Sequence, residues 1–406
     1  MRIIVQKFGG TSVSAPGQRE AAVNHVFEAI SQGFRPAVVV SAMGRAGEPY
    51  ATDTLLTLAE AVGPRTNSRE LDLIAACGEI ISAVVMVNTL RARGIEACAF
   101  TGAQAGIFTD HNHTAAGIIR LNPARIVQAL EAGKVAVVAG FQGVTEDGET
   151  TTLGRGGSDT TAAAMGVALR AEVIEIYTDV EGVKTADPRI VPEAKTIDQI
   201  TYHEISQMAH EGAKVVHPTA VEIAMSKNIP LRVRSTFSSS LGTLITAAPR
   251  EEGAWLELRA SKVITGVTHM PGMAQIRVDT PDGDHAEELR IFTALADAGV
   301  SVDLINVSPE RKSFIVKEDA ADRARAVLSD LGFQVVLKRG CAKVSVVGTG
   351  MRGVPGVMAN VVKGLVKAGV RILQTSDSHL TISCLIEQAD MEKAVRALHE
   401  QFGLGD

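Results

Sequence analysis

The chain has 406 residues, of which 46% are apolar and only 4% aromatic, and its formal net charge is −6. This length suggests two or three domains. The negative charge argues against nucleic acid or an anionic membrane as the main partner. Dispersed cysteines within apolar stretches indicate buried thiols rather than metal or redox sites. The cysteines are Cys77, Cys98, Cys341 and Cys384.

The first residues run directly into an apolar strand at Ile3, without the pattern of a signal peptide. We also expect no apolar stretch long enough to span a bilayer. Together these features predict a cytoplasmic protein that does not bind membranes.

Up to about Ile245, short apolar runs alternate with helical stretches. The runs are rich in β-branched residues and lack polar alternation, which predicts a mostly parallel sheet that is buried on both faces. Helices with an apolar stripe would cover it and give a three-layer α/β domain. The runs are Ile3–Val5, Ala37–Val40, Val135–Ala139 and Val173–Tyr177, and the clearest stripe is Val23, Val26, Phe27 and Ile30.

Small polar residues follow these runs. Because ligands bind beyond the carboxyl ends of strands in open α/β sheets, we expect these loops to converge on one crevice. The loop residues are Lys7, Gly9, Gly10 and Thr11, then Ser41 and Gly44, then Gly140 and Gly143, and finally Thr178 and Asp179.

Lys7 precedes the glycine pair in "KFGG", whereas the usual phosphate loop carries its lysine after the glycines. A lysine at a strand end is commonly a solvated charge. Lys7, however, is embedded between Val5, Phe8 and a glycine turn, where a cation can neutralise phosphate oxygens in a transition state. A phosphate cradle of another design and a plain tight turn both fit this spacing.

A second glycine turn lies in "TTLGRGGSDTTAAAMGVAL", residues 151–169. Its glycines allow close backbone approach, and the N-terminus of the following helix attracts anions. Arg155 within the turn offers a planar fork that suits a carboxylate. Ser158 or Asp159 can cap the helix, so an ordinary capped turn is the alternative.

Two further carboxylates stand out. Asp179 in "IYTDVEG" can serve a ribose or a metal, or simply cap a turn. Glu79 in the apolar stretch "IAACGEIIS" needs a cationic partner if it is buried, such as a substrate ammonium group, and faces solvent otherwise. The ten histidines show no metal-ligand spacing.

Beyond a linker at residues 248–262, the chain contains an internal repeat. "ADAGVSVDLI" (Ala296–Ile305) and "VKAGVRILQT" (Val366–Thr375) align at an offset of about 70 residues. Each copy is followed by a strand and a helix, so both read as β-α-β-β-α, the ferredoxin-like arrangement. A single irregular α+β domain is the alternative.

Eight motifs occur in order and together resemble the aspartokinases, enzymes of the amino-acid-kinase fold that phosphorylate L-aspartate. The resemblance covers the whole chain and implies a catalytic domain at 1–247, the linker at 248–262 and two ACT domains at 263–339 and 340–406. Residues 41–56 and 372–379 resemble the diaminopimelate-sensitive type of Bacillus-like bacteria. The motifs are "VQKFGGTSV", "VVVSAMG", "FTGAQAGI", "AGFQG", "TTLGRGGSDTTA", "EIYTDVEGV", "TADPRIV" and "GAKVVHP".

The resemblance also implies roles for individual residues. Lys7 and Asp159 would be catalytic, with Asp159 orienting the phosphoryl site. The ATP site would comprise Lys7, Phe8, Gly9, Gly10, Ser41, Thr178, Asp179, Lys184, Thr185, Asp187, Arg189 and Lys214. The aspartate site would comprise Ser41, Thr52, Glu79, Arg155, Gly156, Gly157 and Ser158. One departure is Lys184, which stands where many relatives have an aromatic residue, so nucleotide contacts there follow less directly than at Asp179.

ATP with Mg²⁺ is the implied cofactor, without protein ligands assigned to the metal. The ACT pair implies feedback control by an amino acid, with diaminopimelate first and lysine or threonine next. The implied effector residues are Met273, Ala274, Asp303, Asn306, Gln374 and Ser376. A homo-oligomer, dimer or tetramer, is expected, with a shorter regulatory subunit if translation also starts at Met208 or Met225.

Two other functions fit parts of the pattern. One is a different kinase of the same fold, acting on glutamate or acetylglutamate, which the Arg155 loop, Glu79 and the ACT pair disfavour. The other is an amino-acid sensor with an inactive kinase domain, which the intact Lys7 and Asp159 disfavour. A dinucleotide dehydrogenase is disfavoured because no G-x-G-x-x-G follows the first strand.

Overall fold

The computed structural model describes residues 1–63, 67–213, 215–247, 263–280, 285–349, 351 and 354–405. Contacts divide the chain into two compact units. The N-terminal unit comprises Met1–Val183, Thr196–Ala209 and Lys214–Glu252, and the C-terminal unit comprises Lys184–Lys195, His210–Ala213 and Gly253–Asp406. Two short segments therefore group with the C-terminal unit, although a single cut near residue 247 was expected. The predicted linker, 248–262, lies outside the described residues.

The N-terminal unit is built on an eight-stranded sheet with the order β10-β12-β11-β9-β1-β2-β6-β3. All of its strand pairs are parallel except β11 with β12. The four predicted apolar runs are confirmed as strands of this sheet. The strands are β1 (Ile3–Phe8), β2 (Arg35–Val40), β3 (Ala97–Phe100), β6 (Val135–Ala139), β9 (Val173–Thr178), β10 (Gln199–Thr201), β11 (Leu231–Ser235) and β12 (Thr243–Thr246).

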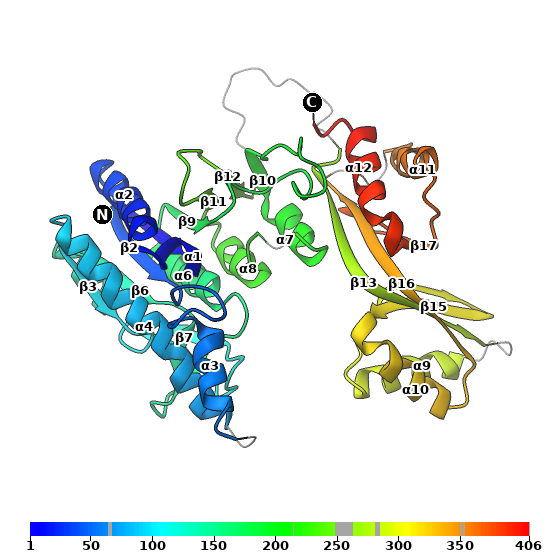
Figure 1. Ribbon diagram of the computed structural model, residues 1–406, viewed down its shortest axis with the longest axis horizontal. Helices are drawn as coiled ribbons and strands as arrows, with labels where there is room; N and C mark the ends of the chain where they lie inside the picture. The colour runs from blue at the N-terminus through cyan, green and yellow to red at the C-terminus, as the bar shows by residue number, and fades with distance from the viewer. Residues whose placement is uncertain are drawn as a thin grey trace. The chain divides into compact units, whose positions relative to one another are not determined.

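Helices cover both faces of this sheet (Figure 1). Helices α2 (Pro16–Ser31) and α4 (Ser68–Ala92) bury Val26 and Met86 in one core with Tyr177 of β9. Side chains alternate along a strand, so Ile174 of β9 faces the other side, where it contacts α6 (Gly157–Leu169) at Gly166. The remaining helices are α1 (Gly10–Val13), α3 (Thr52–Glu60), α5 (Ala124–Glu131), α7 (Tyr202–His210) and α8 (Pro218–Ser226).

The apolar stripe of α2 differs from the predicted one. Val23 and Val26 are buried as expected, but Phe27 is 56% exposed. Ala22 and Ala29 complete the buried face instead. The small alanine side chains let the helix approach the sheet closely, and this rotates Phe27 outward.

Helix α4 corrects the expectation that the chain contains no stretch able to span a membrane. By length and composition alone, Ser68–Ala92 is long and apolar enough to do so. In the structure this helix packs against the sheet, with Ala83, Met86 and Leu90 in the same core as Val38 and Val137. Burial against the sheet explains its apolar composition, since a core helix passes the same test.

A smaller sheet, with the order β5-β4-β7-β8, lies in the N-terminal unit. Its strands are β4 (Ile107–Thr109), β5 (Ile118–Leu121), β7 (Gln142–Val144) and β8 (Thr150–Thr152). The strand β8 leads directly into the second glycine turn and α6, and it contacts α4. This sheet therefore connects α4 with the loop that carries Arg155.

The expectation of buried cysteines is correct for only part of the set. Cys341 and Cys384 are buried and Cys98 is partly buried, but Cys77 is exposed. Cys77 lies on the outward face of α4, where its thiol donates to the Leu73 carbonyl at 3.3 Å. Of its apolar neighbours, Ala75 and Ala76 are buried, whereas Leu73 is exposed like Cys77.

The C-terminal unit contains one antiparallel sheet of six strands, with the order β14-β15-β13-β16-β18-β17. Its strands are β13 (Gly266–Asp279), β14 (Asp303–Ser308), β15 (Arg311–Lys317), β16 (Val335–Val347), β17 (Gln374–Asp377) and β18 (Thr381–Glu387). Its helices are α9 (His285–Asp297), α10 (Ala321–Asp330), α11 (Val357–Lys367) and α12 (Met391–Gln401), with short 3₁₀ turns η1 (Glu318–Ala320) and η2 (Gln388–Asp390).

The predicted repeat is confirmed. The difference from the prediction is that the two halves share strands of one sheet. The long strands β13 and β16 pair along most of their length and each passes from one ferredoxin-like half to the other (Figure 1). Helices α9 and α10 pack on one core with Ile276 and Phe314. Helices α11 and α12 pack on a second core with Val344 and Leu398, which also includes Ile190. Burial of Ile190 and its neighbours explains why residues 184–195 group with this unit.

Candidate active site

Lys7 and Asp159 form an ion pair at the carboxyl edge of the large sheet. Lys7 lies near the end of β1 and Asp159 in the first turn of α6, and Lys7 Nζ is 2.8 Å from Asp159 Oδ1. Their side chains are 13% and 14% exposed. The second carboxylate oxygen accepts the backbone N–H of His217 at 3.4 Å. The structure thus brings together two residues that the sequence places in separate loops.

The first glycine turn is held tightly against neighbouring strand ends. The N–H of Gly9 donates to the Tyr177 carbonyl of β9 at 3.3 Å, and the N–H of Ser41 donates to the Phe8 carbonyl at 3.1 Å. At Gly10, a Cβ atom would lie 2.6 Å from the Ala42 carbonyl oxygen. Any side chain at Gly10 would therefore separate the loops after β1 and β2, which explains glycine at this position.

The second glycine turn ends at Gly156, which forms the N-cap of α6 in the left-handed region with a φ of 69°. A Cβ atom there would lie 2.2 Å from His217, so both conformation and close packing require glycine. The prediction that Ser158 or Asp159 caps the helix is wrong, because the N-cap is Gly156 and no side chain caps it. Asp159 uses its carboxylate for Lys7 and His217 instead.

Glu79 is buried on α4, with 3% of its surface exposed, so it does not face solvent. Its Oε1 accepts the N–H of Ala42 at 3.1 Å. Its Oε2 is buried without a hydrogen-bond partner within the described part of the chain. Burial raises the pKa of Glu79 to about 8, although the Ala42 N–H opposes this shift. A cation that reached Oε2 would satisfy this oxygen and favour the ionised form.

Arg155 and Asp179 are both exposed. Arg155 lies between the glycines of the second turn and forms no ion pair with any residue that the structure describes. Asp179 follows β9 and pairs with Arg45 at 3.0 Å, while the hydroxyl of Thr178 donates to Asp179 at 3.2 Å. Thr52 begins α3 and is partly buried. Arg155, Asp179 and Thr52 therefore lie outside the buried core.

The predicted nucleotide loop belongs to the other unit. Thr185 hydrogen-bonds to His399 at 2.9 Å, and Arg189 pairs with Asp187 at 2.6 Å and holds the pKa of that carboxyl below its usual value. These residues, with Lys184, are therefore not part of the site that the N-terminal unit builds by itself. Lys214 lies outside the described residues.

Asp72 is a buried residue that sequence reasoning missed. It is fully buried on α4 and accepts the N–H of Thr114 at 3.0 and 3.1 Å, the hydroxyl of Thr152 at 2.5 Å and the Nδ1 of His113 at 2.6 Å. Thr114 adopts a φ of 69°, and its carbonyl lies 3.3 Å from where a Gly154 Cβ atom would stand. Asp72 therefore braces the loop beside the Arg155 turn. The signal in the sequence is a carboxylate in an apolar helix two turns before Glu79, on the same face.

A second buried network lies beneath the first glycine turn and also escaped prediction. The hydroxyl of Tyr177 donates to Glu175 at 2.7 Å, and Arg234 pairs with Glu175 at 3.3 Å. The ring of His25 lies 4.5 Å from that of Tyr177. Because the Tyr177 carbonyl accepts the Gly9 N–H, this network fixes the backbone on which the turn rests.

The predicted effector residues lie in the C-terminal unit. Met273 and Ala274 are buried at 3% and 0% exposure. Asp303 pairs with Lys343 at 2.5 Å. Gln374 accepts a hydrogen bond from Gln275 at 2.8 Å and donates to the Leu304 carbonyl. Asn306 and Ser376 lie on the edge strands β14 and β17, at the ends of the sheet order.

A lysine–carboxylate pair thus lies between two glycine turns at the carboxyl edge of a parallel sheet. The model of the amino acid kinase family matches residues 2–235, which contain this pair, and that of the ACT domain matches residues 336–400. The chain is therefore a phosphotransferase of the amino-acid-kinase fold with a regulatory ACT module.

Comparison with individual relatives shows which family within this class the chain belongs to. Over 405 residues the chain is 48% identical to "Aspartokinase 1" of Bacillus subtilis (strain 168), covering 100% of both chains. Among solved structures, Escherichia coli aspartokinase III in complex with aspartate and ADP gives a TM-score of 0.79 at 26% identity, covering 98% of this chain and 99% of that one. The same enzyme in complex with lysine and aspartate gives a TM-score of 0.76 at 26% identity, with the same coverage. The chain belongs to the aspartokinase family.

Proposed function

We propose that this chain transfers the γ-phosphoryl group of ATP to the side-chain carboxylate of L-aspartate, giving ADP and 4-phospho-L-aspartate. The observation that carries the proposal is the Lys7–Asp159 pair, 2.8 Å apart where the first glycine turn meets the start of α6. A carboxylate oxygen of aspartate attacks the γ-phosphorus while the bond to the ADP oxygen breaks. Since the side-chain pKa of aspartic acid is about 3.9, the nucleophile is already ionised and needs no general base.

Lys7 would neutralise the charge that develops on the phosphoryl oxygens. It is held near the sheet edge before the reaction, so little reorganisation is needed in the transition state. The backbone N–H groups of the glycine turns would provide the remaining hydrogen bonds to the phosphates. Phe8, Gly9, Gly10 and Ser41 form the first of these turns and its neighbour.

Mg²⁺ would accompany ATP. The described residues contain no group of three or more His, Cys, Asp or Glu side chains placed to hold a metal ion together. This suits Mg²⁺, which commonly uses one or two carboxylates together with substrate phosphates. Asp159 would supply the carboxylate, and the bound ion would offset the negative charge of the phosphates.

Arg155 and Glu79 would recognise aspartate from opposite ends. The exposed guanidinium of Arg155 has two parallel N–H groups that suit a carboxylate. The partnerless Oε2 of Glu79 suits the substrate ammonium group. Gly156, Gly157 and Ser158 would contribute backbone and hydroxyl groups from the same turn, and Thr52 would border the site.

The nucleotide would extend along β9. Thr178 and Asp179 follow this strand directly, and Asp179 would exchange its partner Arg45 for the nucleotide. By the family resemblance, the nucleotide site would also include Lys184, Thr185, Asp187, Arg189 and Lys214.

The test is ADP release with purified full-length protein and a panel of acceptors. We expect turnover with L-aspartate and Mg²⁺-ATP, and little with glutamate or acetylglutamate. Turnover with either of those in place of aspartate would favour another kinase of this fold. Absence of ADP release with every acceptor would favour an amino-acid sensor.

The C-terminal unit would confer feedback control by an amino acid. Lysine is bound in one of the structures of aspartokinase III, and the resemblance makes diaminopimelate the first candidate here, followed by lysine and threonine. Titration of the activity with each amino acid identifies the effector, and no inhibition by any of them would contradict the proposal. We also propose a cytoplasmic homo-oligomer, joined through the ACT sheets.

A further inference from the structure

We propose that His217 is a positioning residue for phosphoryl transfer, whose ring Nδ1–H binds the Asp159 carboxylate when Lys7 moves to the phosphates of ATP. This role rests on the proposed kinase function, because the reaction needs Lys7 to leave Asp159. His217 Nδ1 is buried, and it has no hydrogen-bond partner among the residues that the structure describes. A buried polar atom without a partner costs free energy, so a nitrogen of this kind beside a reaction site needs an explanation.

The backbone of His217 is fixed where α6 and α8 meet. Its N–H donates to Asp159 Oδ2 at 3.4 Å, and its carbonyl accepts the N–H of Ala220, in the first turn of α8, at 3.0 Å. Pro218 begins α8 and restricts the residue before it to extended backbone, which agrees with the φ of −73° and ψ of 133° at His217. Helices α6 and α8 also contact each other. His217 is therefore held beside Asp159 by both of its backbone polar groups.

The ring of His217 packs against the glycine turn that carries Arg155. A Cβ atom at Gly156 would lie 2.2 Å from Cγ and 2.3 Å from Cδ2 of His217. The Cδ2 edge of the ring thus lies against the turn, and Nδ1 belongs to the opposite edge. The side chain therefore has two separable features, which are a ring shape that supports Gly156 and a nitrogen that this packing does not use.

Asp159 needs another donor when a nucleotide binds. In the structure its Oδ1 lies 2.8 Å from Lys7 Nζ, and its side chain is only 14% exposed, so water can replace Lys7 only in part. Phosphate oxygens compete with the carboxylate for Lys7, and a lysine that moves to them leaves Asp159 as an anion near other anions. A carboxylate in such a place is stabilised by a cation or by further hydrogen bonds.

The Nδ1 atom of His217 suits this task by its place and its chemistry. A carboxylate oxygen can accept two hydrogen bonds, and Oδ2 of Asp159 already accepts one from the backbone of the same histidine. Nδ1 carries a proton in one neutral tautomer of imidazole and in the charged form. The other oxygen, Oδ1, would then be available to Mg²⁺. No covalent bond changes in this step, because one hydrogen-bonded partner of Asp159 replaces another.

Two substitutions separate the nitrogen from the ring shape. His217→Phe keeps a planar ring against Gly156 but removes Nδ1. His217→Asn places an amide group near the position of Nδ1 but removes most of the ring. Isothermal titration of each full-length variant with Mg²⁺-ATP, and separately with aspartate, measures both affinities without depending on turnover.

The two variants should have opposite effects. We expect His217→Phe to weaken binding of Mg²⁺-ATP by about tenfold, the loss expected for one charge-assisted hydrogen bond, and to leave aspartate binding nearly unchanged. His217→Asn should keep most of the affinity for Mg²⁺-ATP and weaken aspartate binding, because the turn that carries Arg155 loses its packing. Unchanged binding of Mg²⁺-ATP by His217→Phe would overturn the proposal. Parallel losses of both ligands in both variants would indicate a structural role alone and would also overturn it.

Exchange of partners on Asp159 also predicts how His217 and Lys7 depend on each other. In Lys7→Ala no lysine has to leave Asp159, so His217 can donate to the carboxylate both before and after the nucleotide binds. Adding His217→Phe to Lys7→Ala should therefore change the Mg²⁺-ATP affinity much less than His217→Phe does alone. Additive effects would indicate that His217 contacts the phosphates directly, which would overturn the exchange.

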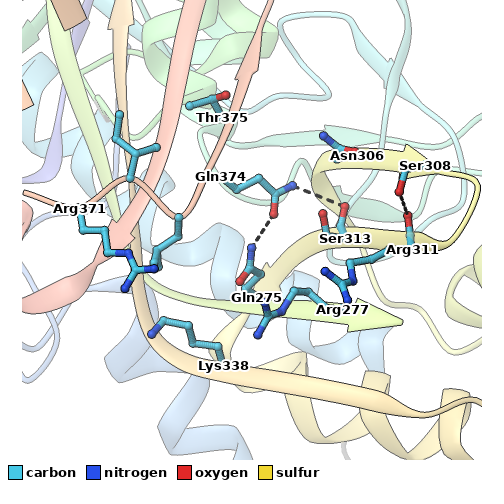
Figure 2. A pocket seen from close by; sticks show the side chains of 12 residues that line it. Gln275, Arg277, Asn306, Ser308, Arg311, Ser313, Lys338, Arg371, Gln374 and Thr375 are labelled. Carbon is cyan, nitrogen blue, oxygen red and sulfur yellow. Dashed lines mark hydrogen bonds between the residues drawn. The ribbon is translucent and has the colours of Figure 1, made fainter. Parts of the chain in front are cut away.

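Two control variants accompany these titrations. His203→Phe introduces the same ring at an exposed histidine of α7 and should change neither affinity. Arg277→Ala tests whether the nucleotide binds instead to cations of the C-terminal unit, and it should leave Mg²⁺-ATP binding unchanged. Loss of binding in Arg277→Ala would assign the bound nucleotide to that unit and overturn the proposal. Figure 2 shows these cations, which are Arg277, Arg311, Lys338 and Arg371.

Failure of the proposed kinase function would be seen separately. If the unsubstituted protein released no ADP with aspartate while the Mg²⁺-ATP affinities followed the expected pattern, the acceptor would be wrong and the role of His217 at Asp159 would stand. If the unsubstituted protein phosphorylated aspartate and His217→Phe kept both normal kcat and normal Mg²⁺-ATP affinity, only the role of His217 would be wrong.

Discussion

Lys7 Nζ lies 2.8 Å from Asp159 Oδ1, so a carboxylate holds the cation in position before any phosphate is present. The arrangement has two consequences. Lys7 is kept from swinging into solvent, and Asp159 is neutralised where an incoming phosphate would otherwise meet a bare negative charge. Binding of Mg²⁺-ATP must then replace this pair with a larger set of charges.

Lys7→Ala is expected to lower kcat by about 100- to 1,000-fold, the range for removing one preorganised stabilising group. The fold should remain, because Lys7 is at a strand end and not in the core. Steady-state ADP release measures the effect, and circular dichroism checks the fold. Lys134→Ala, at an exposed lysine, is the control and should keep normal turnover. Near-normal kcat in Lys7→Ala would remove this residue from the mechanism.

Arg155→Ala is expected to raise the aspartate KM by about 10- to 100-fold, with a smaller change in kcat, because a charge-assisted hydrogen bond of about 1.5–3 kcal/mol is lost. Arg155→Lys keeps the positive charge but removes the planar guanidinium, so it shows which of the two binds aspartate. If the guanidinium binds with both N–H groups, lysine should recover only part of the affinity. An unchanged KM in Arg155→Ala would show that the exposed turn does not contact aspartate.

Glu79 should make stability depend on pH. Its pKa is raised from 4.5 to about 8 in the folded chain, so between these values the folded state binds more protons than the unfolded state. The contribution of Glu79 to the free energy of unfolding is therefore complete below about pH 4.5 and lost as the pH rises through about 8. Urea unfolding at pH 6 and pH 9 measures how much the free energy of unfolding falls over this interval. Glu79→Gln should reduce this fall. An equal fall in both proteins would contradict the burial effect assigned to Glu79.

The ionisation of Glu79 should also change the affinity for aspartate. Only ionised Glu79 attracts an ammonium group, so the aspartate KM is expected to fall as the pH rises from about 6 toward 8. In Glu79→Gln the KM should be higher and nearly independent of pH over this range. A pH profile of KM that survives the substitution would assign the titration to another group.

The sequence could predict the strands and the repeat because both depend on local patterns. Runs such as Val135–Ala139 are apolar on every residue, which indicates a strand buried on both faces. These inferences needed no knowledge of distant contacts. The meeting of Lys7 with the α6 turn, in contrast, was expected only from the family resemblance, because that turn follows β8 of the smaller sheet.

The features that could not be predicted from the sequence depend on contacts between residues that are far apart along the chain. The cap of α6 is Gly156 because His217, far along the chain, leaves no space for a Cβ atom. Phe27 is exposed because neighbouring alanines set the rotation of α2 against the sheet. Neither outcome is encoded in the periodicity of the segment itself.

Asp72 offers the last prediction. Asp72→Ala removes the acceptor for the Thr114 N–H and the Thr152 hydroxyl, which leaves buried donors without partners. This should cost about 2–3 kcal/mol of unfolding free energy, measured by urea denaturation. Because the braced loop packs beside Gly154, the Arg155 turn should also become less ordered, and the aspartate KM should rise more than kcat falls.

Asp72→Asn tests whether the shape or the charge of the Asp72 side chain is responsible for the stability and for the low aspartate KM. The amide oxygen keeps one acceptor of similar geometry, so this variant should recover part of the stability and part of the KM. Asp53→Asn, at an exposed carboxylate in the first turn of α3, is the control and should change neither quantity. If Asp72→Ala loses stability while its aspartate KM stays normal, Asp72 supports only the fold. A rise in KM that asparagine partly reverses would make it a positioning residue for the substrate turn.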